Sequence, residues 1–317
     1  LRPRGDRIVG LESKSSGPVS FMGIFDAVCQ TIASSGHRRG AQMGVLRIDH
    51  PDIESFITAK SNSDKLTGFN VSVGVTDEFM QCLIKKKPFD LKFNGEVYDT
   101  IDPEALWDMI MRMTWDWAEP GVLFLDTINK MNNLYYCEQI EATNPCGEQP
   151  LPPYGACLLG SFNLPKYIEK RVFNFRQFED DIEVCVRAMD NVIDRTIYPL
   201  PEQEQEAKAK RRMGLGVTGL ANCAEMCGYP YGSKEFMRFT AKLMRVLRDQ
   251  TYSISSDLAV EKGSFPLFDS QKYLTGQFAK TLPDWVREKI GVQGLRNSHL
   301  TSIAPTGTIS LTADNVS

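Results

Sequence analysis

The sequence contains the stretch NPCGE, which places a thiol, Cys146, two residues from an amide, Asn144, and two residues from a carboxylate, Glu148. Pro145 and Gly147 exclude a regular helix, so we expect the thiol at the tip of a loop, where it can protrude into a cavity. A carboxylate nearby disfavours a thiolate, because like charges repel, whereas a cysteine nucleophile needs a cation or an imidazole beside it.

A thiol that keeps its proton suits one-electron chemistry, because a thiyl radical forms when S–H loses a hydrogen atom. Glu148 would then act as a general base, and Asn144 would hold substrate hydroxyls as a neutral clamp. The alternative is a proline-rich turn around a buried cysteine, and the spacing alone favours that alternative. A Cys–His hydrolase has no support in the sequence, because every histidine lies far along the chain from Cys146. The three histidines are His37, His50 and His299.

A second thiol, Cys157, follows Cys146 after eleven residues, at the start of an expected strand. If the intervening loop folds back as a finger, both sulfurs can face one cavity, and Cys157 can supply electrons by forming a disulfide with a third cysteine. The alternative for Cys157 alone is a residue of the core. Cys223 and Cys227 are spaced i, i+4 on an expected helix, and we interpret them as buried structural thiols rather than metal ligands. We therefore expect no metal site.

Two further stretches suit phosphate groups. APTGTIS offers Thr306, Thr308, Ser310 and the backbone N–H groups around Gly307 at an expected helix N-terminus, which would form an anion cradle; a simple Thr/Gly turn is the alternative. GHRRGAQ (36–42) is a cationic loop that suits nucleotide phosphates, with a solvated surface loop as the alternative. GLGVTG (214–219) has the spacing of a dinucleotide fingerprint but lacks its βαβ context, so we interpret its glycines as packing positions.

The elements that must position these residues alternate between strand and helix, which predicts an α/β fold with a parallel or mixed sheet. Ranges expected to be helical are 19–33, 50–60, 76–86, 102–121, 175–197, 233–262 and 283–290; expected strands include 44–48, 69–75, 122–126, 156–164 and 299–311. No linker divides the chain, so we expect one domain over residues 1–317. The net charge of −4 excludes a general affinity for polyanions, and no apolar run approaches the length of a membrane span. Eight cysteines without a secretion signal indicate a reducing, cytoplasmic compartment.

Five stretches, in this order, resemble the catalytic α chain of ribonucleotide reductases, and most closely the adenosylcobalamin-dependent class II enzymes. RPRGDRI with SGPVSFM resembles the first specificity loop and the helix after it. RRGAQMGVLRIDHPDIESFITAK resembles the second specificity loop and the strand and helix that follow. NPCGE resembles the thiyl finger loop, Cys157 with SFNL its continuation, and APTGTISL the loop that binds the substrate's phosphates.

The resemblance implies a ten-stranded α/β barrel of two half-barrels, with the finger loop through its centre. It implies that a radical on Cys146 abstracts the ribose 3′ hydrogen, that Glu148 takes the 3′-OH proton and that Asn144 holds the hydroxyls. Cys157 and a partner cysteine would supply two electrons. The implied phosphate-binding residues are Pro305, Thr306, Gly307, Thr308, Ile309 and Ser310, and the implied effector residues are Lys14, Ser16, Arg38, Arg39 and Gln42.

The resemblance also implies partners. They are a ribonucleoside di- or triphosphate substrate, a dNTP or ATP effector, a thioredoxin- or glutaredoxin-type reductant and a second copy of the chain. Adenosylcobalamin is the expected radical source, with a separate metal-containing β subunit as the alternative. The family's partner redox cysteine lies upstream of RPRGDRI and its last barrel strands lie beyond TADNVS, so we expect the barrel here to be incomplete at both ends. The rival interpretation is a non-catalytic or split nucleotide-binding dimeric fragment that needs missing segments in trans or by splicing.

Overall fold

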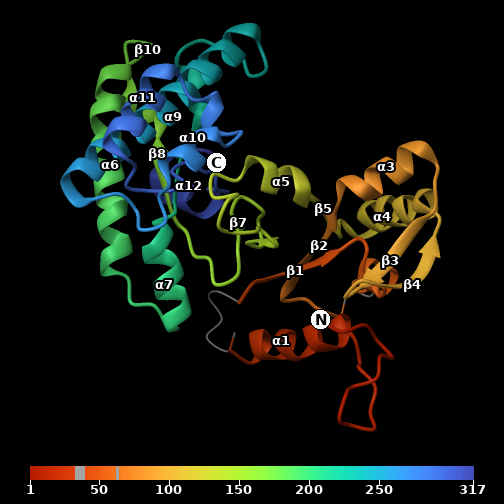
Figure 1. Cartoon of the computed structure of the whole chain (residues 1–317). Coiled ribbons are helices and arrows are strands. Elements are labelled where there is room, and N and C mark those ends of the chain that lie inside the picture. Colours follow the sequence, from red (N-terminus) through yellow and green to blue (C-terminus); the bar gives the residue numbers. More distant parts are fainter. Residues whose placement is uncertain (33–39, 62–63) are drawn as a thin grey trace. The chain divides into compact units, whose positions relative to one another are not determined.

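The computed structural model describes residues 1–32, 40–61 and 64–317, and it confirms a mixed α/β fold (Figure 1). The chain divides into two compact units. Unit 1 comprises Leu1–Asn129 and Ile140–Pro150, and unit 2 comprises Lys130–Gln139 and Leu151–Ser317. The NPCGE stretch therefore belongs to unit 1, whereas Cys157 and residues 305–310 belong to unit 2.

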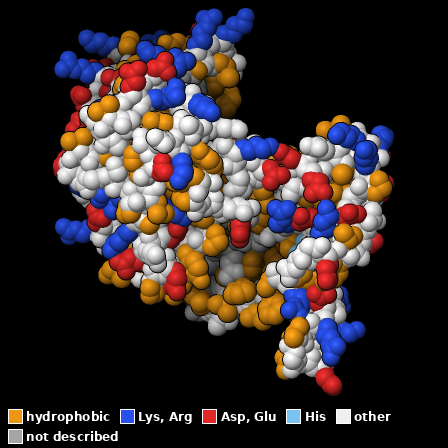
Figure 2. All heavy atoms as spheres, in the orientation of Figure 1, with side chains coloured by type: hydrophobic (Ala, Val, Ile, Leu, Met, Phe, Trp, Pro, Cys, Tyr) orange, Lys and Arg blue, Asp and Glu red, His pale blue; other side chains and the backbone are white. Residues whose placement is uncertain are grey.

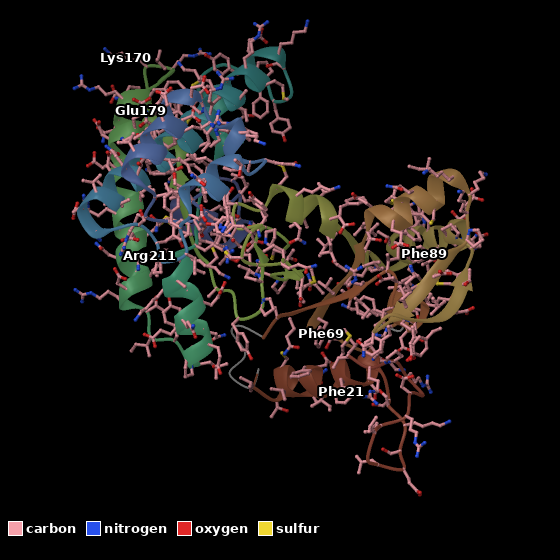
Figure 3. All side chains as sticks on the ribbon, viewed as in Figure 1. Phe21, Phe69, Phe89, Lys170, Glu179 and Arg211 are labelled. Carbon is pink, nitrogen blue, oxygen red and sulfur yellow. The ribbon has the colours of Figure 1, made fainter. Side chains whose placement is uncertain are left out.

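Unit 1 is built on a parallel sheet with the strand order β1-β2-β5. The central strand β2 is buried at six of its seven positions, as expected for a parallel strand that is covered on both faces. Its valines pack with Phe56, Phe79, Phe89 and Ile110 in one apolar core, and Figure 3 marks Phe69 and Phe89 on their strands. The elements of this part of the chain are α1 (Pro18–Ile32), β1 (Gln42–Arg47), α2 (Ile53–Ile57), β2 (Phe69–Val75), α3 (Asp77–Lys85), β3 (Phe89–Phe93), β4 (Glu96–Ile101), α4 (Pro103–Trp117), β5 (Gly121–Phe124), α5 (Leu125–Met131), β6 (Ala142–Thr143) and β7 (Pro150–Leu151).

Local sequence signals explain where several of these elements begin and turn. Thr76 caps α3 by accepting a hydrogen bond from the Phe79 N–H, as its position before the helix predicts. Asn94 and Gly95 join β3 to β4 with φ of 50° and 86°, the pair of positive values that a two-residue type I′ hairpin requires. The expected helix over 50–60 is shorter in the structure, because α2 covers only Ile53–Ile57.

Unit 2 is built around a parallel pair, β8 with β11, and two long helices, α6 and α9, that pack on each other. Its core joins side chains of both strands and both helices, including Phe162, Leu215, Phe178 and Leu243. The remaining elements here are β8 (Leu158–Asn163), η2 (Leu164–Tyr167), β9 (Ile168–Glu169), β10 (Val172–Phe173), α6 (Phe175–Arg195), α7 (Pro201–Lys210), β11 (Met213–Thr218), α8 (Leu220–Met226), α9 (Lys234–Lys262), α10 (Ser270–Thr275), η3 (Ala279–Thr281), α11 (Asp284–Gln293) and α12 (Gly307–Ala313). Among residues 1–32, 40–61 and 64–317, no helix is long and apolar enough to cross a bilayer.

The strand expected over 299–311 is wrong in its second half. Residues near Leu300 run beside β11, with hydrogen bonds from the Met213 N–H to the His299 carbonyl (3.0 Å) and from the Leu215 N–H to the Leu300 carbonyl (2.8 Å). The chain then leaves the strand and forms α12 from Gly307 onward. A strand pattern and a short helix that follows a turn are difficult to separate in a run of small and β-branched residues.

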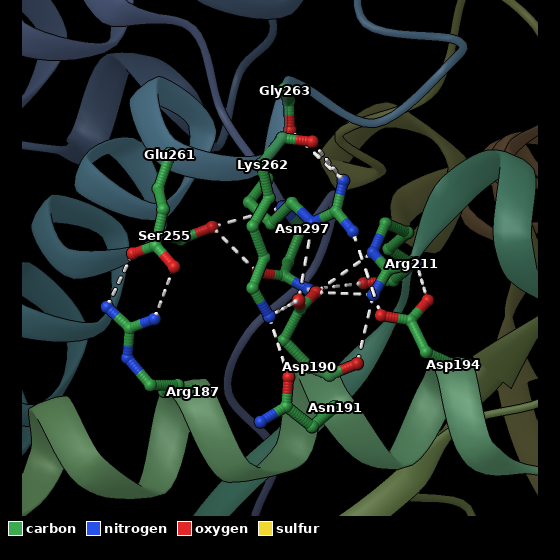
Figure 4. Close-up of polar contacts among 11 residues, drawn as sticks. Arg187, Asp190, Asn191, Asp194, Arg211, Ser255, Glu261, Lys262, Gly263 and Asn297 are labelled. Atoms are coloured by element: carbon green, nitrogen blue, oxygen red, sulfur yellow. Dashed lines mark hydrogen bonds and ion pairs between the residues drawn. The ribbon is translucent and has the colours of Figure 1, made fainter.

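A buried ion network joins the two long helices of unit 2 to the start of β11 (Figure 4). The Asp190 carboxylate of α6 accepts hydrogen bonds from Arg211 Nε and from Asn297 Nδ2, both at 2.9 Å. Lys262 Nζ and Arg296 Nε reach its second oxygen at 3.2 and 3.3 Å. Asp190 is completely buried, so its charge is stable there only because several donors surround it.

We expect Asp190→Asn to lower the free energy of unfolding by about 3 kcal/mol, because it leaves the buried Arg211 with one fewer counter-charge. Chemical denaturation at pH 7 measures this loss. The matched control is Glu261→Gln, which removes the exposed ion pair with Arg187 between the same two helices and should cost far less, because solvent screens exposed charges. Equal losses in the two variants would contradict the assigned role of burial.

The effect of Asp190→Asn should also depend on pH. Burial by itself would raise the pKa of Asp190, but the hydrogen bond and charge of Arg211 outweigh burial and hold this pKa below its usual value. A carboxyl whose pKa is lower in the folded state stabilises the protein above the pKa of the unfolded state, about 3.9, and this contribution disappears as the pH falls through the folded pKa. The stability difference between wild type and variant should therefore shrink below about pH 4.

Candidate active site

The NPCGE stretch forms the tip of a hairpin between β6 and β7. The Gly147 N–H donates to the Asn144 carbonyl at 3.0 Å, and the Asn144 N–H donates to the Gln149 carbonyl at 3.1 Å. Gly147 has a φ of +84°, whereas Cys146 does not have a positive φ. Pro145 at the second turn position and a left-handed glycine after the turn match a type I turn followed by a bulge. We call residues 144–149 the finger turn.

Asn144 has a structural role in the finger turn that its sequence position does not reveal. Its side-chain Oδ1 accepts a hydrogen bond from the Gln149 N–H at 3.0 Å, which closes the turn from within. Its Nδ2 has no acceptor among the residues that the structure describes. If Asn144 contacts a substrate, it can therefore do so as a donor through Nδ2 while Oδ1 maintains the turn.

Cys146 is exposed at the tip of the finger turn, and Glu148, two residues on, is half-buried. The expected loop-tip position is thus confirmed, and the alternative of a buried cysteine in a turn is wrong. Apart from its two chain neighbours, no described residue comes within 4 Å of a Cβ placed on Gly147, so the outer side of the turn at Gly147 is open. The sulfur is accessible to a reaction partner that approaches from outside this unit.

Neither described histidine has a ring nitrogen available as a base for Cys146. His50 Nε2 lies 2.9 Å from the Leu1 carbonyl, and His50 Nδ1 accepts from the Asp52 N–H at 3.0 Å. His299 is half-buried, with its ring nitrogens 3.0 Å from Ser298 Oγ and Asn132 Oδ1. Desolvation of the ring, with the nearby positive charges of Arg212 and Lys210, holds the pKa of His299 well below its usual value. His37 lies outside the described residues. The described histidines therefore give a Cys–His hydrolase no support.

Two asparagines that sequence reasoning missed hold the finger turn in place. Asn129, on α5, accepts from the Ile140 N–H (2.7 Å) and donates to the Ile140 carbonyl (2.9 Å), which fixes the start of the segment. Asn70, on β2, donates from Nδ2 to the Pro145 carbonyl at 3.0 Å. The available signal for Asn70 was an amide in a strand, FNVSVGV, whose other residues are apolar or small.

Cys157 lies in unit 2, immediately before β8, and is half-buried; its Sγ lies 3.5 Å from the Leu158 carbonyl. Because Cys146 belongs to unit 1, joint action of the two sulfurs stays a prediction. At the other end of β8, Asn163 donates to the Ala313 carbonyl (2.8 Å) and accepts from Asn315 Nδ2 (2.8 Å). Asn163 of the SFNL stretch thus anchors the end of α12, which sequence reasoning did not assign.

The APTGTIS stretch begins α12 as expected at a helix N-terminus, with Thr306 as the residue before the helix. Thr306 makes no side-chain capping bond, and Gly307 has open space around the position of a Cβ. Ser310 is buried and donates its hydroxyl to the Gly307 carbonyl at 2.7 Å, so this hydroxyl acts inside the helix. Pro305, Thr308 and Ile309 are exposed. These exposed residues and the uncapped first turn are the surface that a phosphate would meet.

The predicted effector residues are distributed over the first part of unit 1. Lys14 is exposed on a hairpin arm, where residues 14 and 7 form an antiparallel bridge, and Gln42 is the first residue of β1. Ser16 lines a cavity of about 490 Å³ at the start of α1, together with Arg4, Asp52 and Ser55. Arg38 and Arg39 lie outside the described residues.

The other motifs have structural roles. Cys223 lies on α8 and is buried, and Cys227, just after this helix, is half-buried. Burial raises the pKa of the Cys223 thiol to about 12. A Cβ on Gly216 would clash with the Ser302 carbonyl oxygen, so this glycine of GLGVTG permits close approach of the segment beside β11. Among the described residues, no group of three or more His, Cys, Asp and Glu side chains could hold a metal ion.

Comparison with known proteins places these features in a family. The family model described as "Ribonucleotide reductase, barrel domain" matches residues 1–317. The chain is 40% identical over 99% of its length to a vitamin B12-dependent ribonucleoside-diphosphate reductase of Mycobacterium tuberculosis, and covers 43% of that protein. It is 39% identical over 99% of its length to the enzyme of the same name from Thermoplasma acidophilum, of which it covers 39%.

A third relative, a vitamin B12-dependent ribonucleotide reductase of Streptomyces coelicolor, is 29% identical over 94% of the chain, and the chain covers 36% of that protein. The chain thus spans about two fifths of the length of these curated relatives. Because the family model matches its whole length, the chain belongs to the ribonucleotide reductase family and corresponds to the barrel domain of that family.

Proposed function

We propose that this chain is part of the catalytic subunit of a ribonucleotide reductase and carries its radical site. The observation that carries the proposal is the exposed thiol of Cys146 at the tip of a closed hairpin, between the amide of Asn144 and the carboxylate of Glu148. A thiol that loses a hydrogen atom needs exposure and a fixed position, and it needs neither an imidazole nor a cation. The finger turn meets these requirements within unit 1.

In the proposed reaction, the Cys146 sulfur, as a thiyl radical, takes the 3′ hydrogen atom of the ribose. Glu148 accepts the proton of the 3′-OH, and Asn144 donates from Nδ2 to a ribose hydroxyl, which leaves its Oδ1 in the turn. The 2′-OH leaves as water with a proton from one of two thiols, Cys157 and a partner cysteine. The other thiol gives its hydrogen atom to C2′, and the two sulfurs become a disulfide, with the remaining electron passing to the ribose at C3′. Glu148 returns its proton to the 3′ oxygen, and Cys146 returns the hydrogen atom to C3′. The products are a deoxyribonucleotide, water and one disulfide.

Adenosylcobalamin is the radical source that we propose, because the relatives at 39–40% identity are named vitamin B12-dependent. The residues present fit such a group, because the Cys146 thiol is exposed at the tip of the finger turn. When bound, adenosylcobalamin supplies the one-electron chemistry that removes a hydrogen atom from a thiol. Cys146 is the residue of this chain that would face it. A separate metal-containing β subunit is the alternative source.

The names of the same two relatives favour a ribonucleoside diphosphate as the substrate. Its phosphates would meet residues 305–310, where the first turn of α12 has no side-chain cap and its backbone N–H groups are available to an anion. The anchor of Asn163 on the end of α12 supports a fixed position for this helix. Effector nucleotides, a dNTP or ATP, would contact Lys14, Ser16 and Gln42, together with Arg38 and Arg39.

The ten-stranded barrel, as one domain over residues 1–317, remains part of the proposal. The two parallel sheets of the described residues, β1-β2-β5 and β8-β11, support it as portions of two half-barrels. Segments found in the longer relatives would complete the barrel and supply the partner cysteine. A thioredoxin- or glutaredoxin-type protein would reduce the disulfide, and we propose a cytoplasmic location, where such reductants act. The rival proposal is a nucleotide-binding dimeric fragment without catalysis.

We expect Cys146→Ala to reduce turnover at least about a thousand-fold, because no other group can replace the abstracting sulfur. The measurement is formation of deoxyribonucleoside diphosphate by this chain with the flanking segments of the complete enzyme, adenosylcobalamin and a dithiol. The matched control is Cys137→Ser, which alters another exposed thiol and should leave turnover unchanged. Full activity of Cys146→Ala would reject the radical-site assignment and favour the non-catalytic fragment.

Glu148→Gln should lower kcat about a hundred-fold with little change in KM, because the amide keeps the size of the side chain but cannot accept the 3′-OH proton. Steady-state kinetics with the same substrate measures this effect. A rise in KM at unchanged kcat would show that Glu148 binds the substrate without acting as a base.

We also propose that α1 forms the contact between two copies of the chain. Phe21, Ile24, Phe25, Val28 and Ile32 are all exposed on this helix, and Figure 2 shows hydrophobic side chains gathered over it. The opposite face is fixed within unit 1, since Met22 packs on Gly44 of β1, and the buried Asp26 accepts from the Gly68 N–H at 2.7 Å. An exposed apolar face of this kind is typical of a protein–protein interface.

Phe25→Glu should convert a dimer to a monomer, because it places a charge in the middle of this apolar face. Light scattering coupled to size exclusion measures the mass. The control is Ile84→Glu on α3, which alters a residue that is even more exposed and should leave the mass unchanged. A dimer that persists in Phe25→Glu would assign the contact to another surface.

A further inference from the structure

Asn70 contacts the finger turn at Pro145, which lies 75 residues further along the chain. It lies on the central strand β2 and is the one exposed residue of that strand, whose other six side chains are buried. Its Nδ2 donates to the Pro145 carbonyl at 3.0 Å. This carbonyl belongs to the peptide bond that leads directly into Cys146.

The contact constrains the direction of the thiol. A peptide unit is planar, so a hydrogen bond that fixes the Pro145 carbonyl also fixes the Cys146 nitrogen and Cα in the same plane. The bonds among residues 144, 147 and 149 determine the shape of the finger turn, but each of them joins two residues of the turn itself. The Asn70 bond is different because it connects the tip of the turn to the sheet.

Asn70 is itself held in a well-defined position. On one side, the Phe69 carbonyl accepts from Lys60 Nζ; on the other, the Val71 N–H donates to Glu119 Oε1 at 3.1 Å. Lys60 and Glu119 also form an ion pair with each other. Asn70 is further paired in register with residue 43 of the neighbouring parallel strand β1. The donor therefore projects from backbone that is bonded on both sides.

We infer that Asn70 is a positioning residue for the proposed radical reaction and that it orients Cys146 through the Pro145 carbonyl. The catalytic consequence rests on the function proposed above, whereas the effect on the finger turn does not. Hydrogen-atom transfer requires the reacting atoms close together and aligned, and a displacement of about 1 Å can lower a rate about a hundred-fold. Loss of the Asn70 bond should therefore affect kcat far more than substrate binding.

The variant that isolates the bond is Asn70→Asp, which keeps the size of the side chain but replaces the N–H donor with an oxygen that repels the carbonyl. Asn70→Ala is the second variant, in case the aspartate prevents folding. The control is Thr100→Val, which removes an exposed side-chain hydrogen bond to Asp90 in the β3–β4 hairpin of the same unit. All variants are prepared in the complete enzyme with its cofactor.

Two readouts are needed. Hydrogen exchange, resolved by mass spectrometry on peptides covering residues 144–149, reports the finger turn without catalysis; we expect exchange about five-fold faster in both Asn70 variants, as for loss of one hydrogen bond. Steady-state kinetics should show kcat reduced at least about ten-fold with KM within about two-fold of wild type. Thr100→Val should match wild type in both measurements.

The inference is overturned if the Asn70 variants exchange like wild type, or if exchange accelerates while kcat is unchanged. A larger rise in KM than fall in kcat would also overturn it, because Asn70 would then act in substrate binding. These results differ from failure of the proposed function, in which the wild-type enzyme itself forms no deoxyribonucleotide. In that case hydrogen exchange alone decides whether Asn70 holds the finger turn.

Discussion

The hydrogen bonds that close the finger turn are the constraint on which the candidate site depends. A cysteine can be a donor of a hydrogen atom only if its sulfur is exposed and its position is reproducible, and a free loop would supply exposure alone. Here Gly147 bonds back to Asn144, and the Asn144 side chain bonds forward to Gln149, so the six residues form a rigid tip with Cys146 outermost. The hydrogen bonds of the finger turn thus account both for the exposure of the thiol and for its fixed position.

The same turn explains why an amide and a carboxylate flank the thiol. Asn144 uses Oδ1 for the fold and keeps Nδ2 as a donor without an acceptor among the described residues, a division that a carboxylate cannot make because it has no donor. Glu148 lies beyond the left-handed Gly147, half-buried in the part of the chain that returns to β7. Because the backbone needs a glycine at position 147, one residue without a side chain separates the Cys146 thiol from the proposed base.

In unit 2, buried charges stabilise the arrangement of segments. Three consecutive cations are buried there: Lys210, Arg211 and Arg212. Lys210 and Arg212 both form ion pairs with Glu138 and Glu206. Arg211 forms ion pairs with Asp190 and Asp194. Such pairs specify which segments meet, because an incorrect arrangement would leave a buried charge without a partner. The three cations directly precede β11, and the residues before APTGTIS run beside that strand. The network thus fixes the strand that positions the proposed phosphate-binding residues.

The sequence by itself determined the features that depend on a few neighbouring residues. Pro145 and Gly147 restrict φ locally, so the loop tip at Cys146 was predictable, as were the Thr76 cap and the β2 strand. The strand over 299–311 was wrong in its second half because short runs of small residues do not distinguish a strand from a turn and helix. Only the tertiary structure decided that Asn70 meets Pro145 and that Asn163 holds α12. Those contacts join residues 75 and 150 positions apart, and they exist because packed strands and helices bring distant residues together, which no local backbone preference encodes.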